Sequence, residues 1–167
     1  MDTLWAPWRM EYIEEESKDP ETGCLFCPRI AADQDQKNLI VYRAPRMIVF
    51  MNKYPYNNGH TLVMPLRHVG ELDELDRQEF YELFDTVRLA RRALDRVMKP
   101  HGYNIGINLG LVAGAGVPDH LHVHIVPRWN GDTNFMPVLA GVKVMPEHLA
   151  RTRDKLARAF AELAGGK

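Results

Sequence analysis

Three histidines occupy alternating positions in the segment PDHLHVHIVPRW, residues 118–129. Neutral imidazole can act as a nucleophile, transfer a proton near pH 7 or ligate a metal ion. Side chains two apart on a β-strand share a face, so the spacing predicts a strand with His120, His122 and His124 on one face. The other face would belong to the core and carry Leu121, Val123 and Ile125. A metal-chelating tract and a chance cluster on an exposed strand are the alternatives, but histidine-rich tracts seldom alternate with aliphatic residues in this way.

Two cysteines, Cys24 and Cys27, are separated by two residues in the sequence GCLFCPRI. This spacing is compatible with a redox pair, with half of a metal site, or with no chemistry at all. A thioredoxin-like pair would follow a strand and open a helix, whereas residues 14–23, EEESKDPETG, are typical of a polar loop. The loop disfavours redox chemistry. A zinc site would need two further ligands, which histidines would have to supply.

The composition of the whole chain excludes several classes of protein. Its 167 residues, 46% hydrophobic and 26% charged, are typical of one globular domain spanning residues 1–167. A net charge of -1 argues against a nucleic-acid-binding surface. The N-terminus lacks the apolar segment of a secretory signal peptide, and no apolar run approaches the ~20 residues of a membrane span. We therefore expect a cytoplasmic protein that binds neither nucleic acid nor membrane.

Four segments of the chain predict short β-strands. Residues 38–44, 47–52 and 60–65 are rich in β-branched and aromatic residues, and the Ala-Pro-Arg sequence between the first two indicates a hairpin. Residues 103–110 alternate as a fourth strand would, and a glycine-rich loop, 111–119, separates them from the histidine strand.

Two longer segments have the helical period. Asp76 and Glu79 match an N-cap and its N3 partner, and apolar residues then recur at three- and four-residue steps up to Pro100. The inward face of this helix would carry Phe80, Leu83, Phe84, Val87, Ala90, Leu94 and Val97. Residues 146–164 predict a second helix, with Leu149, Leu156, Phe160 and Leu163 inward, and residues 27–33 a short one. The order of elements predicts an α+β fold with an antiparallel sheet, one long helix and a C-terminal helix.

The sequence HLHVHIV resembles the signature of the histidine triad (HIT) family of nucleotide hydrolases and transferases. CLFC, FMNKYP, GHTLVMPLRH and NIGINLG are similar to family motifs and follow in the family's order, so the resemblance covers about residues 20–130. LWAPWRMEYI and PRWNGDTNF further resemble the bacterial branch related to diadenosine tetraphosphate phosphorylases, also called ATP adenylyltransferases. The resemblance implies a HIT-like fold with an N-terminal arm and a C-terminal helix.

The resemblance also implies roles for the histidines. The middle histidine of the family attacks the α-phosphorus of a nucleotide and forms a covalent nucleotidyl-histidine, which corresponds to His122 here. His124 would donate to a phosphate oxygen or to the leaving group, and His60 would orient the site.

The nucleotide-binding residues are assigned in the same way. Asn52 would hold the ribose, and Phe50 would either wall the base pocket or simply pack in the core. The backbone around Gly114 and Gly116 would contact phosphate, together with the Asn108 amide. The best-known members carry a Gln-Ser/Thr pair before the first histidine, and this chain lacks it. Phosphate binding would therefore depend more on the backbone and on Asn108.

Zinc-bearing members imply a use for the cysteines. Their ligands are two cysteines, a histidine after the third strand and the first triad histidine, which correspond to Cys24, Cys27, His68 and His120. A site with four protein ligands would be structural. No organic cofactor is implied.

The leading hypothesis for function is nucleotidyl transfer from a dinucleoside polyphosphate, such as diadenosine tetraphosphate, to inorganic phosphate. The alternatives are hydrolysis of dinucleoside polyphosphates or nucleoside phosphoramidates, and noncatalytic nucleotide binding, for which the expected degenerate triad is absent. Lys53, Arg128 and Arg9 are the candidate cations for attracting phosphate. Members of the family commonly pair as homodimers, so the resemblance implies a homodimer here.

Overall fold

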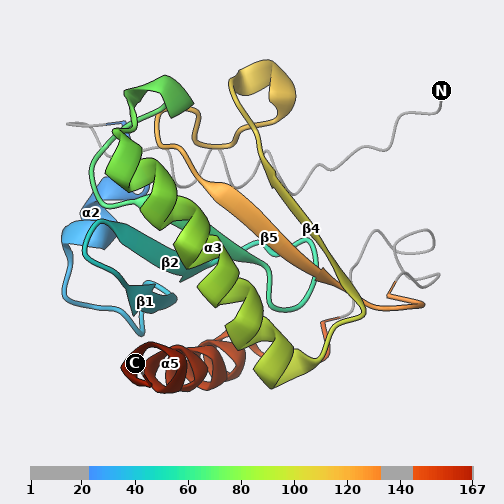
Figure 1. Ribbon diagram of the computed structural model, residues 1–167. Coiled ribbons are helices and arrows are strands. Elements are labelled where there is room, and N and C mark those ends of the chain that lie inside the picture. Colours follow the sequence, from blue (N-terminus) through green and yellow to red (C-terminus); the bar gives the residue numbers. More distant parts are fainter. Residues whose placement is uncertain (1–22, 133–144, 167) are drawn as a thin grey trace, which may run out of the picture.

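A five-stranded antiparallel sheet forms the centre of the structure, a computed structural model that describes residues 23–132 and 145–166 (Figure 1). Its strands lie in the order β1-β2-β3-β5-β4, and each neighbouring pair is antiparallel. The strands are β1 (Ile40–Arg43), β2 (Met47–Met51), β3 (Thr61–Pro65), β4 (Gly102–Ile107) and β5 (Val123–Arg128). The sheet and its helices confirm the predicted α+β fold, including the hairpin between the first two strands.

Two helices, α3 (Arg77–Met98) and α5 (Leu149–Gly165), pack against each other and contact the sheet (Figure 1). The predicted cap of α3 is confirmed. Asp76 accepts a hydrogen bond from the Glu79 backbone N–H at 2.7 Å, and the Glu79 carboxylate accepts one from the Asp76 N–H at 3.0 Å. The helix ends in a left-handed residue, Lys99, directly before Pro100. None of the helices in the described part of the chain is long and apolar enough to span a membrane.

The inward face of α3 was predicted correctly only in part. Leu83, Val87, Ala90 and Leu94 are buried, whereas Phe80 and Phe84 are 43% and 42% exposed. The two phenylalanines lie at the edge of the apolar stripe. The face of the helix that packs toward the sheet is centred on Leu83 and Ala90. The further buried positions are taken by Glu79, Thr86 and Ala93.

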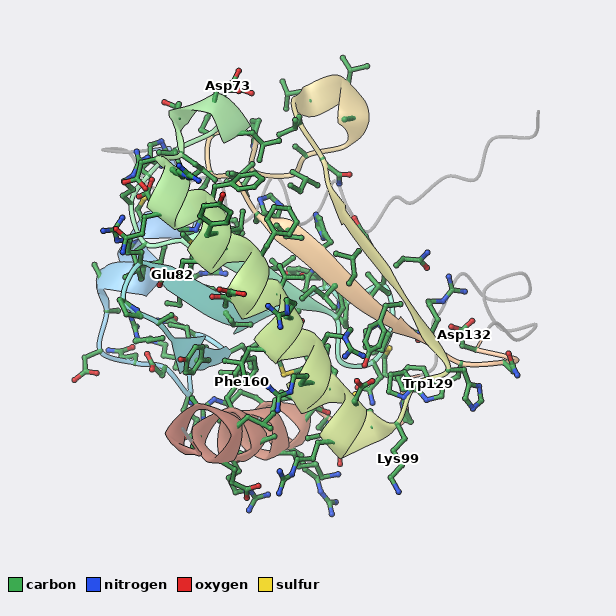
Figure 2. All side chains as sticks on the ribbon, viewed as in Figure 1. Asp73, Glu82, Lys99, Trp129, Asp132 and Phe160 are labelled. Carbon is green, nitrogen blue, oxygen red and sulfur yellow. The ribbon has the colours of Figure 1, made fainter. Side chains whose placement is uncertain are left out.

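The main core fills the space between the helices and one face of the sheet. It contains alternate residues of the strands, including Val49, Val63 and Ile125, as expected when successive side chains point to opposite faces. Phe160 of α5 is fully buried, and its ring stacks on Tyr42 of β1 at a centroid distance of 5.0 Å (Figure 2). The other inward residues predicted for α5 also contact this core, although the helix begins at Leu149 rather than at residue 146.

A second hydrophobic cluster lies on the opposite face of the sheet, since it takes the other alternate strand residues. It joins Ile48 and Phe50 of β2 and Leu62 of β3 to Cys24 and Phe26. The short helix α2 (Cys27–Ala31) follows directly. The N-terminal cysteine segment is thus packed on the face that carries the histidines.

The histidine strand is shorter than predicted. β5 begins at Val123, so that only His124 lies within it, and β4 ends at its partner Ile107. The ladder with β3 also stops at Val123, because the next residues on β3 lead to Pro65, which has no N–H to donate. The Leu121 N–H instead donates to the Val69 carbonyl at 2.6 Å. The alternation of faces nevertheless holds, with Leu121, Val123 and Ile125 in the main core.

Replacing Phe160 with alanine should lower the free energy of unfolding by about 3–5 kcal/mol, because a fully buried ring leaves a cavity between α5 and β1. Chemical denaturation of the variant measures the change. Arg158→Ala, at an exposed position of the same helix, should change the stability by less than about 0.5 kcal/mol. Equal effects of both variants would contradict this account of how α5 docks.

Candidate functional site

The hydrogen bond of His122 defines which of its two ring nitrogens carries the proton. Its side chain is buried, and its Nδ1 lies 2.7 Å from the carbonyl oxygen of His120. A carbonyl can only accept, so Nδ1 carries the proton and Nε2 keeps its lone pair. Burial lowers the pKa of His122, which favours the neutral ring at pH 7. This tautomer is the one that a nucleophilic histidine attacking through Nε2 requires.

His60 and His124 are hydrogen-bonded to each other, and their contacts define the tautomer of each ring. The backbone N–H of Tyr56 donates to His60 Nδ1 at 3.1 Å, so the proton of a neutral His60 lies on Nε2. His60 Nε2 is 3.0 Å from His124 Nδ1 and donates to it. A neutral His124 therefore carries its own proton on Nε2. The His122 and His124 rings are 4.9 Å apart, which places a proton donor beside His122.

Asn52 is bound into the loop that leads to His60. Its Oδ1 accepts from the Tyr54 N–H at 3.0 Å, and its Nδ2 lies 3.3 Å from His60 Nδ1. Both contacts assign the amide orientation and support the same His60 tautomer. Contact between Asn52 and a ribose stays a prediction.

The structure places Phe50 in the second hydrophobic cluster, where it is 2% exposed and packs on Phe26 at a ring distance of 5.8 Å. Its contact with a base stays a prediction. Phe26 was missed in the sequence, although its ring lies 5.5 Å from His122 and 5.6 Å from His120. The available indication was an aromatic residue inside the Cys-x-x-Cys segment, whose ring had to pack somewhere near the cysteines.

Tyr56 was also missed. Its ring is nearly parallel to that of His124, at 11° and 5.9 Å, and lies 4.7 Å from His60. It is 39% exposed and so forms the open side of the histidine pair. An aromatic residue four positions before His60, in the turn-rich sequence YPYNNGH, was the available indication.

The predicted glycine-rich loop between β4 and β5 contains a short helix that was not predicted from the sequence. Gly110 and Gly114, with φ of 77° and 86°, flank the short helix η2 (Leu111–Ala113). Asn108 Nδ2 lies 3.5 Å from the Gly114 carbonyl and so spans the loop. Gly116 lies on the exposed part of the loop, before the buried Val117. Contacts of this loop with phosphate stay predictions.

Of the candidate cations, Arg128 is paired with an acidic side chain. Arg128 makes hydrogen bonds to both carboxylate oxygens of Asp132, at 2.6 and 3.0 Å, and one to Asn104 at 2.8 Å. This group lies at the end of β5 opposite η2 (Figure 2), so Asp132 neutralises the Arg128 charge away from His122. Lys53 lies 5.4 Å from the centre of the Tyr54 ring. Arg9, with the LWAPWRMEYI segment, lies outside the described residues, as does the end of PRWNGDTNF.

The four predicted metal ligands come together from distant parts of the chain. One donor atom from each of Cys24, Cys27, His68 and His120 lies within 4.8 Å of all the others. Two of the distances are 3.4 Å, from Cys24 Sγ to His120 Nδ1 and from Cys27 Sγ to His68 Nδ1. His120 Nε2 donates to the Pro65 carbonyl at 2.9 Å, so the Nδ1 lone pair faces the sulfurs. Burial lowers the pKa of His120, which favours the neutral form that ligates metals. Two thiolates and two imidazoles fit a tetrahedral zinc ion.

Comparison with known proteins gives consistent results. The family model described as HIT domain matches residues 33–131. AP-4-A phosphorylase of Mycobacterium tuberculosis is 40% identical over 166 residues, which cover 96% of this chain and 85% of the relative. The asymmetrical bis(5'-nucleosyl)-tetraphosphatase of Schizosaccharomyces pombe is 40% identical over 93 residues, covering 56% of this chain and 50% of the relative. A Zn-bound histidine triad family protein from Mycobacterium smegmatis has a TM-score of 0.69 and 27% identity, covering 86% of this chain and 97% of that one.

Proposed function

The chain belongs to the histidine triad (HIT) family, and on this basis we propose that it transfers a nucleotidyl group from diadenosine tetraphosphate to inorganic phosphate through His122. The observation that carries the proposal is the neutral His122, whose Nδ1 proton is held by the His120 carbonyl while Nε2 remains able to attack. The name and the 40% identity of the M. tuberculosis relative support phosphate as the acceptor.

In the first step, His122 Nε2 attacks the α-phosphorus, and the bond from that phosphorus to the bridging oxygen breaks. ATP departs and adenylyl-His122 remains. The charge that develops on the His122 ring is stabilised by the His120 carbonyl at Nδ1. His124, oriented by His60, would donate its Nε2–H to the departing oxygen.

In the second step, an oxygen of inorganic phosphate attacks the same phosphorus. The bond between phosphorus and Nε2 breaks and ADP forms. The proton of the attacking hydrogen phosphate passes to His124, which gave one up in the first step, and His122 returns to its neutral state with the Nδ1 proton in place. The overall reaction converts diadenosine tetraphosphate and phosphate into ATP and ADP.

Hydrolysis is the second candidate, because the S. pombe relative is named as a tetraphosphatase. It would proceed through the same adenylyl-histidine, with water as the acceptor. A noncatalytic nucleotide-binding role is less well supported, since all three triad histidines are present and hold defined tautomers.

We further propose that Cys24, Cys27, His68 and His120 hold a structural zinc ion. Four protein ligands leave no open position, so the ion would add rigidity rather than take part in the reaction. His120 would be both a ligand and, through its carbonyl, the acceptor for the nucleophile's Nδ1 proton. The Zn-bound relative from M. smegmatis supports this assignment.

The surface formed by α3 and β4 supports a homodimer. β4 lies at the edge of the described sheet. The large exposed apolar or aromatic side chains on or near these two elements include those of Phe80, Tyr81, Phe84, Ile105 and Leu109. Large exposed apolar patches commonly mark protein interfaces. A purely monomeric species in sedimentation equilibrium at micromolar concentration would contradict the dimer.

Diadenosine tetraphosphate should yield ATP and ADP, at a rate that rises with phosphate concentration and then saturates, because phosphate attacks a preformed adenylyl-histidine. Chromatographic separation of the products, with and without phosphate, makes the measurement. AMP and ATP formed at a rate indifferent to phosphate would show a hydrolase instead.

His122→Ala should reduce turnover by a factor on the order of 10⁴ or more, as removal of other covalent nucleophiles does, while the protein stays folded. Steady-state kinetics and circular dichroism test both parts. His101→Ala removes an exposed histidine that accepts from the Asn130 N–H, and it should leave turnover within about twofold. A His122→Ala protein with a tenth of wild-type turnover would rule out this nucleophile.

Purified protein should contain about one zinc ion per chain, and Cys24→Ser should lower both the zinc content and the melting temperature. Elemental analysis and calorimetry measure the two quantities. Chelation should destabilise the wild type more than it destabilises the variant, because only the wild type has an intact site to lose. Zinc below a tenth of an equivalent, in protein never exposed to a chelator, would contradict the metal assignment.

A further inference from the structure

Of the four proposed zinc ligands, His68 is the one least fixed by the fold. Cys24 and His120 are fully buried, whereas His68 is exposed. It belongs to residues 66–71, which form neither helix nor strand between the end of β3 and the short helix η1 (Leu72–Glu74). An imidazole on such a segment loses conformational freedom when it ligates a metal, and this loss weakens binding unless another contact has already ordered the segment.

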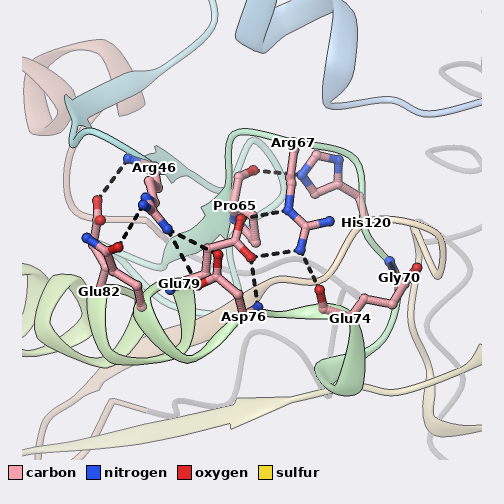
Figure 3. A network of polar contacts seen from close by, with 10 residues as sticks. Arg46, Pro65, Arg67, Gly70, Glu74, Asp76, Glu79, Glu82 and His120 are labelled. Carbon is pink, nitrogen blue, oxygen red and sulfur yellow. Dashed lines mark hydrogen bonds and ion pairs between the residues drawn. The ribbon is translucent and has the colours of Figure 1, made fainter.

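The neighbouring residue, Arg67, makes such a contact. Its Nε and Nη2 donate to the two carboxylate oxygens of Glu79 at 2.6 and 2.7 Å, and Nη2 also donates to the Glu74 carbonyl (Figure 3). This two-bond geometry restricts the guanidinium in direction as well as in position. Arg67 therefore ties the segment to the N-terminus of α3.

Glu79 is a rigid acceptor for this contact. Its side chain is only 8% exposed, and it also accepts the Asp76 N–H as part of the cap of α3. The Arg67 guanidinium lowers the pKa of Glu79 to about 2, so the carboxylate is charged at neutral pH. Its place in the first turn of a helix favours a negative charge as well.

We propose that the Arg67–Glu79 ion pair positions His68 as a metal ligand. The inference rests on the proposed zinc site. Pro65, the last residue of β3 and the one directly before this segment, provides the carbonyl that orients His120. Residues 65–68 therefore control two of the four ligands, and the ion pair holds this stretch in place from the side of α3. Because coupling between binding and structure is reciprocal, bound zinc would in turn order residues 66–71.

A positioning role can be separated from a general effect on stability. Arg67 is 48% exposed but Glu79 is only 8% exposed, so Arg67→Ala also leaves a largely buried charge and lowers global stability. The test therefore needs a control variant and a readout that global stability does not change. Arg46 provides a matched control, because its guanidinium lies 3.2 Å from Asp76 and 2.8 Å from Gln78 at the same end of α3. Arg46 belongs to the hairpin between β1 and β2, which carries no proposed ligand.

The experiment measures the dissociation constant for zinc by competition with a chromophoric chelator, in the absence of nucleotide. Arg67→Ala should raise the constant by about tenfold or more, the usual effect of removing a group that orients a ligand. Arg67→Lys keeps the charge but not the two-bond geometry, so it should restore the affinity only in part. Arg46→Ala should stay within about twofold of the wild type, and His68→Ala sets the scale for complete loss of one ligand.

Cobalt(II) substitution gives a second readout that general destabilisation would not change. The visible absorption of the wild-type cobalt protein should be that of a tetrahedral site with two sulfur and two nitrogen ligands, and Arg67→Ala should shift it toward the spectrum of His68→Ala. An unchanged zinc constant in Arg67→Ala, or an equal loss in Arg46→Ala, would overturn the positioning role alone. A wild-type protein that binds no zinc would overturn the metal site and this inference together, while leaving the proposed nucleotidyl transfer to its own assay.

Discussion

The hydrogen bond from His122 Nδ1 to the His120 carbonyl, at 2.7 Å, is the contact on which the rest of the site depends. It decides which nitrogen carries the proton and therefore which nitrogen can react. Everything that holds His120 in place, from the Pro65 carbonyl to the Phe26 ring, consequently fixes the position of His122 Nε2, the proposed nucleophilic atom.

Burial of these two rings suits both of the proposed chemistries, the nucleophile and the metal ligand. An unpaired polar group is costly inside a protein, but His120 and His122 each donate to a main-chain carbonyl. The same burial lowers the pKa of both rings, and a neutral imidazole is the form needed by a nucleophile and by a metal ligand alike. The sheet makes this possible because it is covered on both faces, by the helices on one side and by the Cys24–Cys27 segment on the other.

Much of the fold could be predicted because its signals are local. The cap at Asp76, the hairpin before Met47 and the split between aliphatic residues and histidines each depend on a few neighbouring residues. The predicted start of the histidine strand was wrong, because the start of β5 depends on Pro65, a residue on another strand. The prediction that Phe80 and Phe84 face inward was wrong, because the rotation of a helix about its axis depends on what it packs against.

The same difference between local signals and long-range contacts applies to the candidate site. The four proposed metal ligands were named through the family resemblance, and the structure does bring them together. Phe26 and Tyr56 were missed, because their ring contacts with His122 and His124 join residues 96 and 68 positions apart and leave no periodic pattern. The pairing of Arg128 with Asp132 was also missed, since a charged residue looks the same in the sequence whether or not it is neutralised.

Two of the contacts that place the protons come from the main chain, namely the Tyr56 N–H and the His120 carbonyl. Every amino acid has a carbonyl, and every one except proline has an N–H, so side chains can be exchanged during evolution without altering these donors and acceptors. Position 56 is therefore free to diverge in ring chemistry while still fixing the protonation pattern of His60. A comparison of related sequences would therefore record the histidine side chains but not the main-chain groups that fix which of their nitrogens is protonated.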